Sequence, residues 1–292
     1  MTDFKVLGHR GAILPDAPFY QNSTAAFAEA LTYGDGFETD ACASSDGEIF
    51  LIHEAKYVHA ETGVEYCVDE HLLPASQALL AGRKLEDMPA AEVRQLRLKD
   101  GSPLPALKDV LEQVGAQAGK ILNIELKAHD VLAPVLRTLR NARLPSAQLM
   151  LSSFNHPSLL QARATLPDAA IGAIFVAADT APAPLFPWHP QAGGHYCPLT
   201  AESLAQPLLQ QVQPDYVVMP DLELNMSNIE LIARYLPKAR IFAWVFTERG
   251  GTPPDQMLQM VRTLSPTGKL AGVMVDNPRL YAAPLKQAAG AV

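Results

Sequence analysis

Short apolar runs alternate with longer amphipathic stretches along most of this 292-residue chain. The amphipathic stretches repeat hydrophobic residues at helical spacing, as in 24–33, where Ser23 or Thr24 is the expected N-cap. The apolar runs are typical of buried strands, and they begin near Lys5, Gly36, Lys120, Gln148, Ile171, Tyr216, Arg240 and Gly272. Strands separated by helices pair in parallel with right-handed crossovers. Eight such units predict an α/β fold, a (β/α)8 TIM barrel; the alternative, an open doubly wound sheet, is disfavoured because no Gly-rich loop opens a helix.

Two segments interrupt this alternation. Residues 54–103 mix polar stretches with amphipathic pieces at 75–81 and 90–98, so we predict a small insertion after the second strand, within one domain over residues 1–292. Residues 177–198 contain five prolines, and a loop of this length is usually functional or disordered. Residues 201–212, which follow this loop, are predicted to form a single helix.

The composition excludes several classes of protein. Charged residues make up 18% of the chain and the net charge is −8, so an acidic surface argues against nucleic-acid binding. The cysteines are three, far apart and without a CxxC pair, which favours neither disulfides nor thiolate zinc and suits a reducing compartment. No apolar run reaches the roughly 18 residues of a membrane span, and no signal sequence opens the chain. We therefore expect a cytoplasmic protein without stable membrane association, whose oligomeric state stays open.

Carboxylates gather where the predicted strands end, the edge that holds the active site in (β/α)8 barrels. Glu38 and Asp40 are two residues apart, so they project from the same face of the second strand, and Glu125 belongs to the third. Three converging buried carboxylates are costly unless one is protonated or a cation neutralises them. Because oxygen ligands suit hard cations, this set favours Mg²⁺ or Ca²⁺ over zinc.

Positive side chains and histidines accompany these carboxylates. Arg10 follows His9 at the end of the first strand, and Lys127 lies two residues after Glu125. Arginine and lysine beside a metal form an anion site that suits phosphate. His9 and His53, at the ends of extended runs, have the chemistry of general acids and bases. A metal ion, two cationic side chains and two imidazoles around a phosphate are typical of a site that cleaves phosphodiesters.

Short motifs containing these residues follow one another in order over nearly the whole chain. They are His9-Arg10-Gly11-Ala12, Gln21-Asn22-Ser23, Phe37-Glu38-Thr39-Asp40, Ser45-Asp46-Gly47, Ile52-His53-Glu54, Pro103-Leu104-Pro105-Ala106-Leu107, Asn123-Ile124-Glu125-Leu126-Lys127, Ser152-Ser153-Phe154, Trp244 and Val275-Asp276-Asn277-Pro278. Each motif alone has little specificity. As an ordered set, they make the chain resemble the glycerophosphodiester phosphodiesterases.

The resemblance implies a barrel with a small insertion after its second strand. It implies a divalent metal held by the three carboxylates, acid–base catalysis by His9 and His53, and phosphate binding by Arg10 and Lys127. The reaction converts a glycerophosphodiester and water to glycerol 3-phosphate and an alcohol. In the implied route the substrate's own 2-hydroxyl attacks phosphorus, and water then opens the cyclic phosphate; which histidine is the base stays open. Trp244 either lines the glycerol or alcohol pocket or belongs to the core.

Three positions depart from the family pattern. Gln21 stands where a glutamate is usual, Glu54 stands where an aspartate follows the histidine, and a common arginine after His53 has no clear match. The loss of a carboxylate at Gln21 changes the charge of the site. Because the three presumed ligands and both histidines remain, we expect an active enzyme.

Other residues have structural and functional interpretations side by side. Asn22 is expected to cap the following helix rather than to take part in chemistry, and Asp276 is either a partner of a site residue or a strand end. Gly11 either takes a positive φ beside the phosphate or makes a plain turn. Trp188 and His189, in the proline-rich loop, are candidates for contact with the leaving alcohol.

Three other functions remain as alternatives. A phospholipase of the same superfamily would need an apolar lip or a membrane-binding loop. A non-catalytic phosphoester-binding module would bind the substrate without turnover. Another metal-dependent hydrolase on this barrel would be marked by histidine ligands, and the sequence has no HxH pair.

Overall fold

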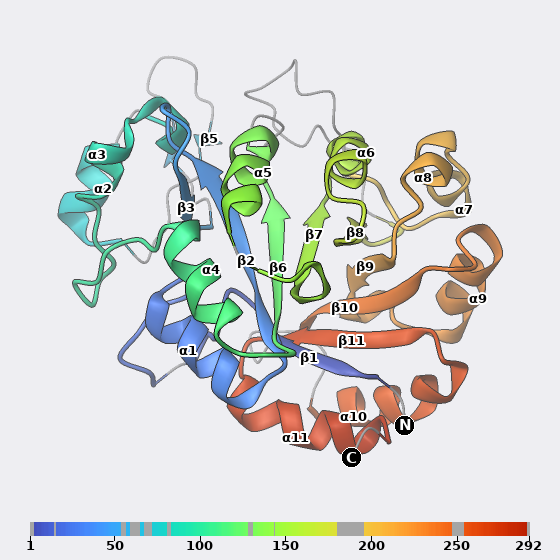
Figure 1. Ribbon diagram of the computed structural model, residues 1–292. Coiled ribbons are helices and arrows are strands. Elements are labelled where there is room, and N and C mark those ends of the chain that lie inside the picture. The colour runs from blue at the N-terminus through green and yellow to red at the C-terminus, as the bar shows by residue number, and fades with distance from the viewer. Residues whose placement is uncertain are drawn as a thin grey trace.

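The computed structural model describes residues 3–14, 16–53, 57–58, 65–66, 72–80, 83–127, 131–142, 144–179, 196–246 and 254–290. Eight parallel strands close into a barrel at the centre of the molecule (Figure 1). In barrel order they are β1 (Lys5–Gly8), β2 (Gly36–Ala43), β6 (Ile121–Leu126), β7 (Leu149–Ser153), β8 (Ala170–Ile174), β9 (Tyr216–Pro220), β10 (Arg240–Phe246) and β11 (Leu270–Val275). Because β1 pairs with both β11 and β2, the ring of eight parallel strands is closed, and the predicted (β/α)8 barrel is confirmed.

Helices between the strands form an outer ring around the barrel (Figure 1). They are α1 (Thr24–Tyr33), α4 (Leu107–Gly115), α5 (Leu132–Asn141), α6 (His156–Thr165), α7 (Ala201–Leu204), α8 (Pro207–Val212), α9 (Met226–Tyr235), α10 (Pro254–Leu264) and α11 (Pro278–Ala288). The start of α1 follows from its sequence, because the Ser23 hydroxyl accepts a hydrogen bond from the Ala26 amide at 3.1 Å. Phe27 of the same helix stacks on Phe37 of β2 with ring centroids 4.4 Å apart.

The prediction of one helix over 201–212 is wrong. The structure has α7 and α8 instead, separated at Gln206. Proline has no backbone N–H, and its ring pushes the preceding residue out of helical conformation. Gln206, which precedes Pro207, is accordingly extended, with ψ 134°.

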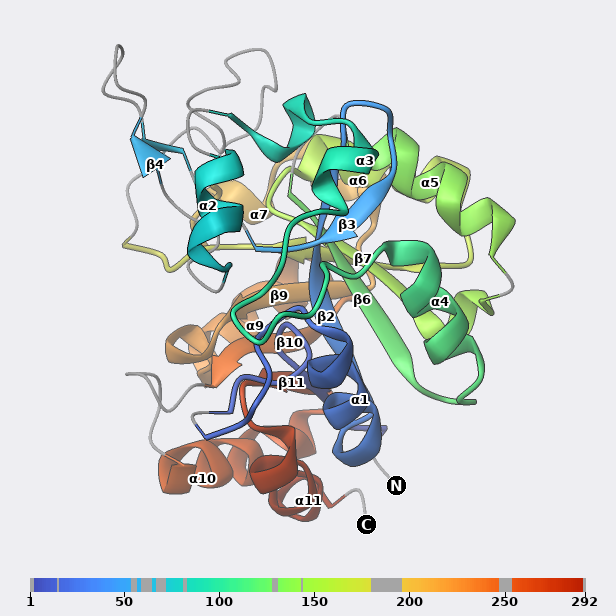
Figure 2. The same cartoon turned by 90° about the vertical axis from the view of Figure 1, so that its left-hand side faces the viewer.

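The inserted segment packs around a small core of its own. It follows β3 (Ile49–Leu51), which is antiparallel to β2, and contributes β4 (Tyr57–Val58), β5 (Glu65–Tyr66), α2 (Pro74–Leu80) and α3 (Ala90–Val93). Buried residues such as Leu72, Val93 and Leu98 form this core together with Phe50. In both ribbon views α2, α3 and β3 lie well away from α10 and α11 (Figure 2). That residues 1–292 form a single domain stays a prediction.

Two apolar layers hold the barrel. One lies between the strands and the ring of helices, and the other fills the barrel interior. The buried members of the interior layer are all apolar: Leu7, Met150, Ile174, Val218, Phe242, Ala271 and Met274. These side chains fill the barrel interior, so that it is a packed core rather than a pore.

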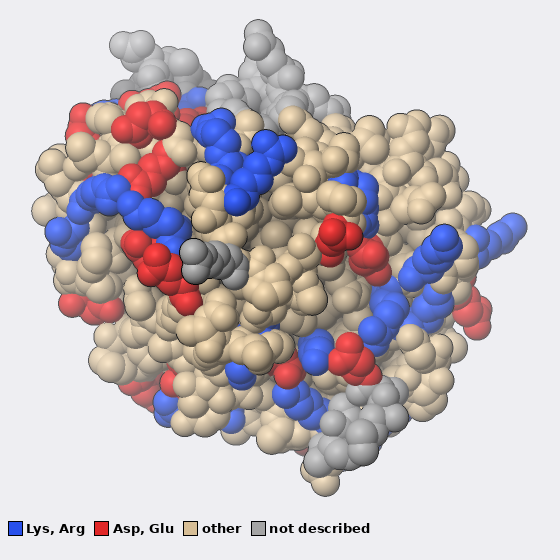
Figure 3. Space-filling model, in the orientation of Figure 1, with Lys and Arg blue, Asp and Glu red and all other residues tan. Residues whose placement is uncertain are grey.

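Several predictions fall outside the described residues: those on Glu54, Trp188 and His189, and most of the loop 177–198. Across the segments that are described, no helix combines the length and the apolar character that crossing a membrane requires. On the face seen in Figure 3, Lys and Arg are interspersed with Asp and Glu. Elsewhere in the structure opposite charges also pair locally, as Lys286 does with Asp35 at 2.7 Å.

Candidate active site

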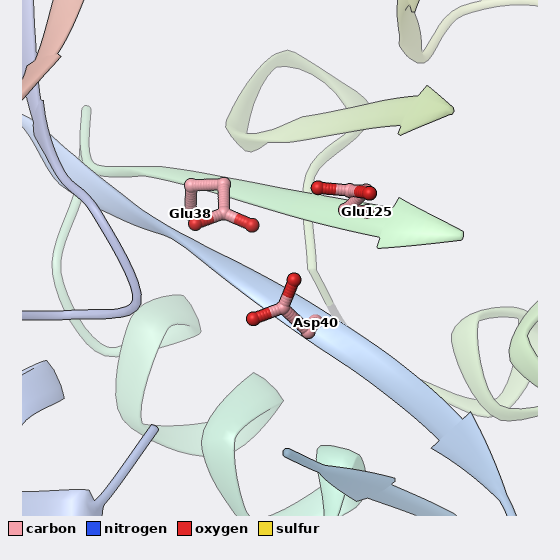
Figure 4. Close-up of side chains that lie close together, drawn as sticks. All are labelled: Glu38, Asp40 and Glu125. Atoms are coloured by element: carbon pink, nitrogen blue, oxygen red, sulfur yellow. The ribbon is translucent and has the colours of Figure 1, made fainter. Parts of the chain in front are cut away.

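Three carboxylates converge at the carboxyl end of β2 and β6. Glu38 and Asp40 come from β2 and Glu125 from β6, with Asp40 and Glu125 directly opposite in the sheet register. One oxygen from each carboxylate lies within 4.8 Å of the others, and the three groups face a common space (Figure 4). Glu38 and Asp40 are 4% and 1% exposed. A buried cluster of this kind has the spacing and the oxygen ligands that a hard divalent cation requires.

The three carboxyl groups differ in proton affinity. Burial, together with the neighbouring Asp40 and Glu125 charges, raises the pKa of Glu38 well above its usual range. Burial also raises the pKa of Glu125. Burial opposes ionisation of Asp40 as well, but the Lys127 charge and its other partners outweigh it and hold that pKa well below its usual range. The repulsion among the three carboxylates is therefore only partly compensated by the chain, which leaves room for a cation.

Two positive side chains contact this cluster. The Lys127 ammonium donates hydrogen bonds to Glu125 Oε1 at 2.7 Å and lies 2.9 Å from Asp40 Oδ1. The Nε atom of the Arg10 guanidinium lies 3.4 Å from Asp40 Oδ2. Its Nη1 atom donates a hydrogen bond to the Gln21 side-chain oxygen at 3.1 Å. Gln21 thus orients Arg10, a contact that the sequence did not predict.

The backbone after β1 has an unusual conformation that positions Arg10. Arg10 has φ +50° and Gly11 has φ +82°, so Gly11 does take the positive φ that was one of its two interpretations. The Arg10 amide donates to Glu38 Oε2 at 3.0 Å, which ties the turn to the carboxylate cluster. A β-carbon at Gly11 would lie 2.8 Å from the backbone of Ala26 in α1, so the close approach also requires glycine.

Both candidate histidines face the same cavity. His9 follows β1, and its Nδ1 lies 2.7 Å from Asp276 Oδ1 after β11. Burial and the Arg10 charge lower the pKa of His9, while Asp276 opposes this change. Burial lowers the pKa of His53, two residues after β3, to about 3. Asp276 is therefore a partner of His9 and more than a strand end, and burial favours the neutral form of both imidazoles.

The expectation that Asn22 caps α1 is wrong. Ser23 is the N-cap, and Asn22 has φ +52°, whereas an N-cap residue is extended. The Asn22 amide instead donates to Asp40 Oδ2 at 3.0 Å and accepts from the Thr39 hydroxyl at 2.7 Å. Asn22 holds one oxygen of Asp40, a role hidden in the sequence because asparagine beside a helix start is an ordinary capping signal.

A cavity of about 280 Å³ joins these groups. Trp244 lines it and also packs against the apolar interior of the barrel. Its ring is in edge-to-face contact with Phe154 at 5.9 Å between ring centroids, and Phe154 in turn contacts Tyr196 at 4.9 Å. The cavity thus has an aromatic side opposite the charged one. The full lining is His9, Arg10, Glu38, His53, Asn123, Glu125, Lys127, Ser152, Phe154, Ile174, Val176, Tyr196, Val218, Trp244 and Met274.

Sequence reasoning gave no role in the site to Asn123, Ser152 or Tyr196. For Asn123 a signal existed, because it lies two residues before Glu125 and so on the same face of the strand. Tyr196 comes from the loop after β8, which no periodicity places. A larger groove of about 740 Å³ lies outside the barrel between α4 and α5, lined in part by Glu48, and contains none of the predicted site residues.

Known proteins resemble this chain in sequence and in fold. Relatives named glycerophosphodiester phosphodiesterase come from Caldanaerobacter subterraneus subsp. tengcongensis, 30% identical over 176 residues, and from Bacillus altitudinis, 26% identical over 160 residues. The aligned regions cover 58% and 53% of this chain, and 66% and 60% of the relatives, which is just under two thirds of their length.

Two solved structures share the fold. The glycerophosphodiester phosphodiesterase of Thermotoga maritima has a TM-score of 0.62 at 21% identity, with 96% of this chain and 97% of that chain covered. A phosphodiesterase of Oleispira antarctica, in complex with its product sn-glycerol-3-phosphate, has a TM-score of 0.61 at 19% identity, with 97% and 96% covered. The sequence model of the glycerophosphoryl diester phosphodiesterase family matches residues 9–219, more than two thirds of the chain. The protein therefore belongs to the glycerophosphoryl diester phosphodiesterase family.

Proposed function

We propose that this protein hydrolyses glycerophosphodiesters to glycerol 3-phosphate and an alcohol with the help of a divalent cation. The observation that carries the proposal is the meeting of three carboxylates, two imidazoles and two cationic side chains at one small cavity. The family of the chain names this chemistry, and the Oleispira antarctica relative holds sn-glycerol-3-phosphate as its product.

Glu38, Asp40 and Glu125 would hold the cation, Mg²⁺ or Ca²⁺. Their fit to such an ion rests on their oxygen donors, their mutual spacing and the raised pKa of the buried Glu38 carboxyl. When bound, the cation would neutralise charge on the phosphate oxygens and lower the pKa of a hydroxyl group beside it. Lys127 contacts two of these carboxylates, so the ion competes with an ammonium group for them.

Arg10 and Lys127 would bind the phosphate. Both lie at the cavity, and in this state their charges are directed to carboxylates and to Gln21. A phosphodiester in the cavity offers both side chains a second anionic partner. The planar guanidinium of Arg10 can contact two phosphate oxygens, whereas Lys127 provides a compact charge.

His9 and His53 would move the protons. Asp276 holds the Nδ1–H of His9, which leaves Nε2 as the atom that exchanges a proton with the substrate. The substrate's negative charge favours the protonated form of the imidazole that acts as the acid, against the effect of burial.

The two imidazoles exchange their roles between two steps. In the first step one of them removes the proton of the glycerol 2-hydroxyl, whose oxygen bonds to phosphorus while the bond to the leaving alcohol breaks, and the other protonates that alcohol. In the second step water gives a proton to the imidazole that protonated the alcohol, and the water oxygen bonds to phosphorus. The bond from phosphorus to the 2-oxygen breaks, and the first imidazole returns its proton to that oxygen.

The test is release of glycerol 3-phosphate from glycerophosphocholine and glycerophosphoethanolamine, first with EDTA and then with added Mg²⁺, Ca²⁺ or Mn²⁺. We expect no turnover with EDTA and recovery with at least one cation. The matched control is Glu125→Gln, which keeps the size of the side chain but removes its charge, and it should stay inactive with every cation. Turnover that is unaffected by EDTA would refute the metal dependence.

Two alternatives are outcomes of the same set of experiments. Binding of glycerophosphocholine without turnover, at saturating metal, would identify a phosphoester-binding module. Co-sedimentation with phospholipid vesicles, together with cleavage of the intact lipid, would identify a phospholipase-type phosphodiesterase.

A further inference from the structure

One buried amide in the cavity has no partner for its N–H groups. Asn123, on β6, is 0% exposed, and its Nδ2 has no hydrogen-bond partner among the described residues. The side-chain oxygen of Asn123, Oδ1, accepts a hydrogen bond from the hydroxyl of Ser152 on β7 at 2.9 Å. An unpaired buried donor costs free energy, so its presence in a cavity indicates a ligand that supplies an acceptor.

The described residues around Asn123 supply no acceptor for its Nδ2, and Asn123 lines the cavity. Ser152 is also 0% exposed, and by donating to Oδ1 it turns the NH₂ group of Asn123 the other way. On the β7 side the register partner of Asn123 is Met150, an apolar side chain of the barrel interior. Glu38 is the register partner on the other side. Of the two polar atoms of the Asn123 amide, Oδ1 is already paired with Ser152, and Nδ2 is the one left for the cavity.

A second unpartnered donor faces the same space. Trp244 lines the cavity from β10, and its indole Nε1–H is buried without a partner among the described residues. In the barrel β10 lies across from β6, four strands away along the sheet. Two N–H donors therefore face the cavity from opposite sides, so its inner part suits a group with oxygen acceptors rather than a hydrocarbon.

The depth of Asn123 identifies which part of the substrate it meets. Along β6, Asn123 lies one inward-facing position deeper than Glu125, and it is in register with Glu38, the deeper of the two carboxylates on β2. Ile174, Val218 and Met274 also line the cavity and belong to the apolar interior of the barrel, so only a short group fits below the phosphate. The glycerol unit is short, ends in a hydroxyl and is common to all glycerophosphodiesters, whereas the leaving alcohol varies in size.

We propose that Asn123 is a specificity-determining residue, whose amide N–H donates to the terminal hydroxyl oxygen of the substrate's glycerol unit while Ser152 fixes the orientation of the amide. This inference rests on the proposed function. It assigns selection for glycerol, over alcohols without that hydroxyl, to a neutral donor outside the metal cluster.

The test compares two diesters that differ only in the hydroxyl in question. Glycerophosphocholine has it, and 2-hydroxypropyl phosphocholine lacks it but keeps the attacking 2-hydroxyl. We expect the wild-type protein to prefer glycerophosphocholine by about ten- to a hundredfold in kcat/KM, the effect of leaving one buried donor unpaired. In Asn123→Leu this preference should fall to less than threefold, mainly because glycerophosphocholine is cleaved more slowly.

Control variants separate this contact from a general effect on the fold. Asn155→Leu removes another buried asparagine, which is 2% exposed and lies outside the cavity lining, and it should keep the wild-type preference. Ser152→Ala leaves Asn123 in place without its orienting hydroxyl and should give an intermediate preference; this variant also serves if Asn123→Leu does not fold. An Asn123→Leu protein that is folded and keeps the full preference would overturn the inference.

A binding experiment keeps this inference separate from the proposed reaction. Calorimetric titration with glycerol 3-phosphate and with 2-hydroxypropyl phosphate measures the same contact without turnover. Wild-type preference for glycerol 3-phosphate that disappears in Asn123→Leu would support the contact even if no diester were cleaved. Equal binding of both compounds by the wild-type protein would overturn the inference, while metal-restored cleavage would still stand.

Discussion

The hydrogen bond between His9 and Asp276 allows a quantitative test of the acid–base proposal. The two side-chain atoms are 2.7 Å apart, and Asp276 is only 5% exposed, so water screens the interaction little. Asp276→Asn keeps the shape of the side chain and removes its charge. A hydrogen bond to a charged group contributes about 1.5–3 kcal/mol. At about 1.4 kcal/mol per pKa unit, its loss should lower the pKa of His9 by about one to two units.

The assay is the pH dependence of kcat/KM for glycerophosphocholine at saturating metal. Whether His9 acts as base or as acid, the limb of the profile that reports its titration should move to lower pH. The maximal rate should fall about a hundredfold or more, the usual contribution of a general acid or base.

The control is Asp35→Asn, at the opposite end of the barrel. Asp35 binds Lys286 at 2.7 Å and the amide of Val6 at 2.8 Å, so its loss should lower stability and leave the pH profile in place. An unchanged profile and rate in Asp276→Asn would refute the assignment of His9 as a proton carrier.

Four further predictions concern the metal, the second histidine and acid stability. Glu125→Gln should lose metal binding in calorimetry and still unfold cooperatively; normal metal affinity would remove Glu125 from the site. His53→Ala should lower turnover by about a hundredfold or more, and a near-normal rate would assign its role to another group. Burial and the Asp40 charge raise the pKa of Glu38 above 4.5, so protons compete with the cation for Glu38 at a higher pH than they would at an ordinary glutamate. The affinity for the cation, measured by calorimetry, should therefore fall from pH 7 to pH 5, and a constant affinity would contradict this. Burial lowers the pKa of His156 from 6.5 to about 4, so its neutral form stabilises the fold above pH 6.5. Acidification to pH 4 should remove about 3 kcal/mol of that stability. In His156→Gln the free energy of unfolding, measured in urea, should depend less on pH than in the wild-type protein. An equal pH dependence in both proteins would contradict the assignment.

Most helices and strands can be predicted from the sequence, because their signals are local. The helix Thr24–Tyr33 has the predicted bounds, and the strands Lys5–Gly8, Gly36–Ala43, Tyr216–Pro220 and Arg240–Phe246 begin at the predicted residues. Each follows from a short apolar run, a capping residue or helical periodicity, which act within a few residues. Helical periodicity alone, without regard to Pro207, predicted one helix where the structure has α7 and α8.

The sequence also placed pairs of site residues on one face of a strand. The spacing of two between Glu38 and Asp40, and between Glu125 and Lys127, fixes their side of the sheet whatever the register. Alternation of strands and helices then predicted that such strand ends meet at one rim, because a (β/α)8 barrel gathers them there.

Only the tertiary structure decided which of these groups touch. Asp40 faces Glu125 because β2 pairs with β6 in one register, across the whole inserted segment. His9 meets Asp276, 267 residues away, because β1 closes the barrel against β11. Asn22 reaches Asp40 through a left-handed turn, although its neighbours are typical of a helix cap. Spacing along the chain sets the direction of a side chain, but contact between distant residues depends on strand register and closure, which many long-range packing interactions determine together.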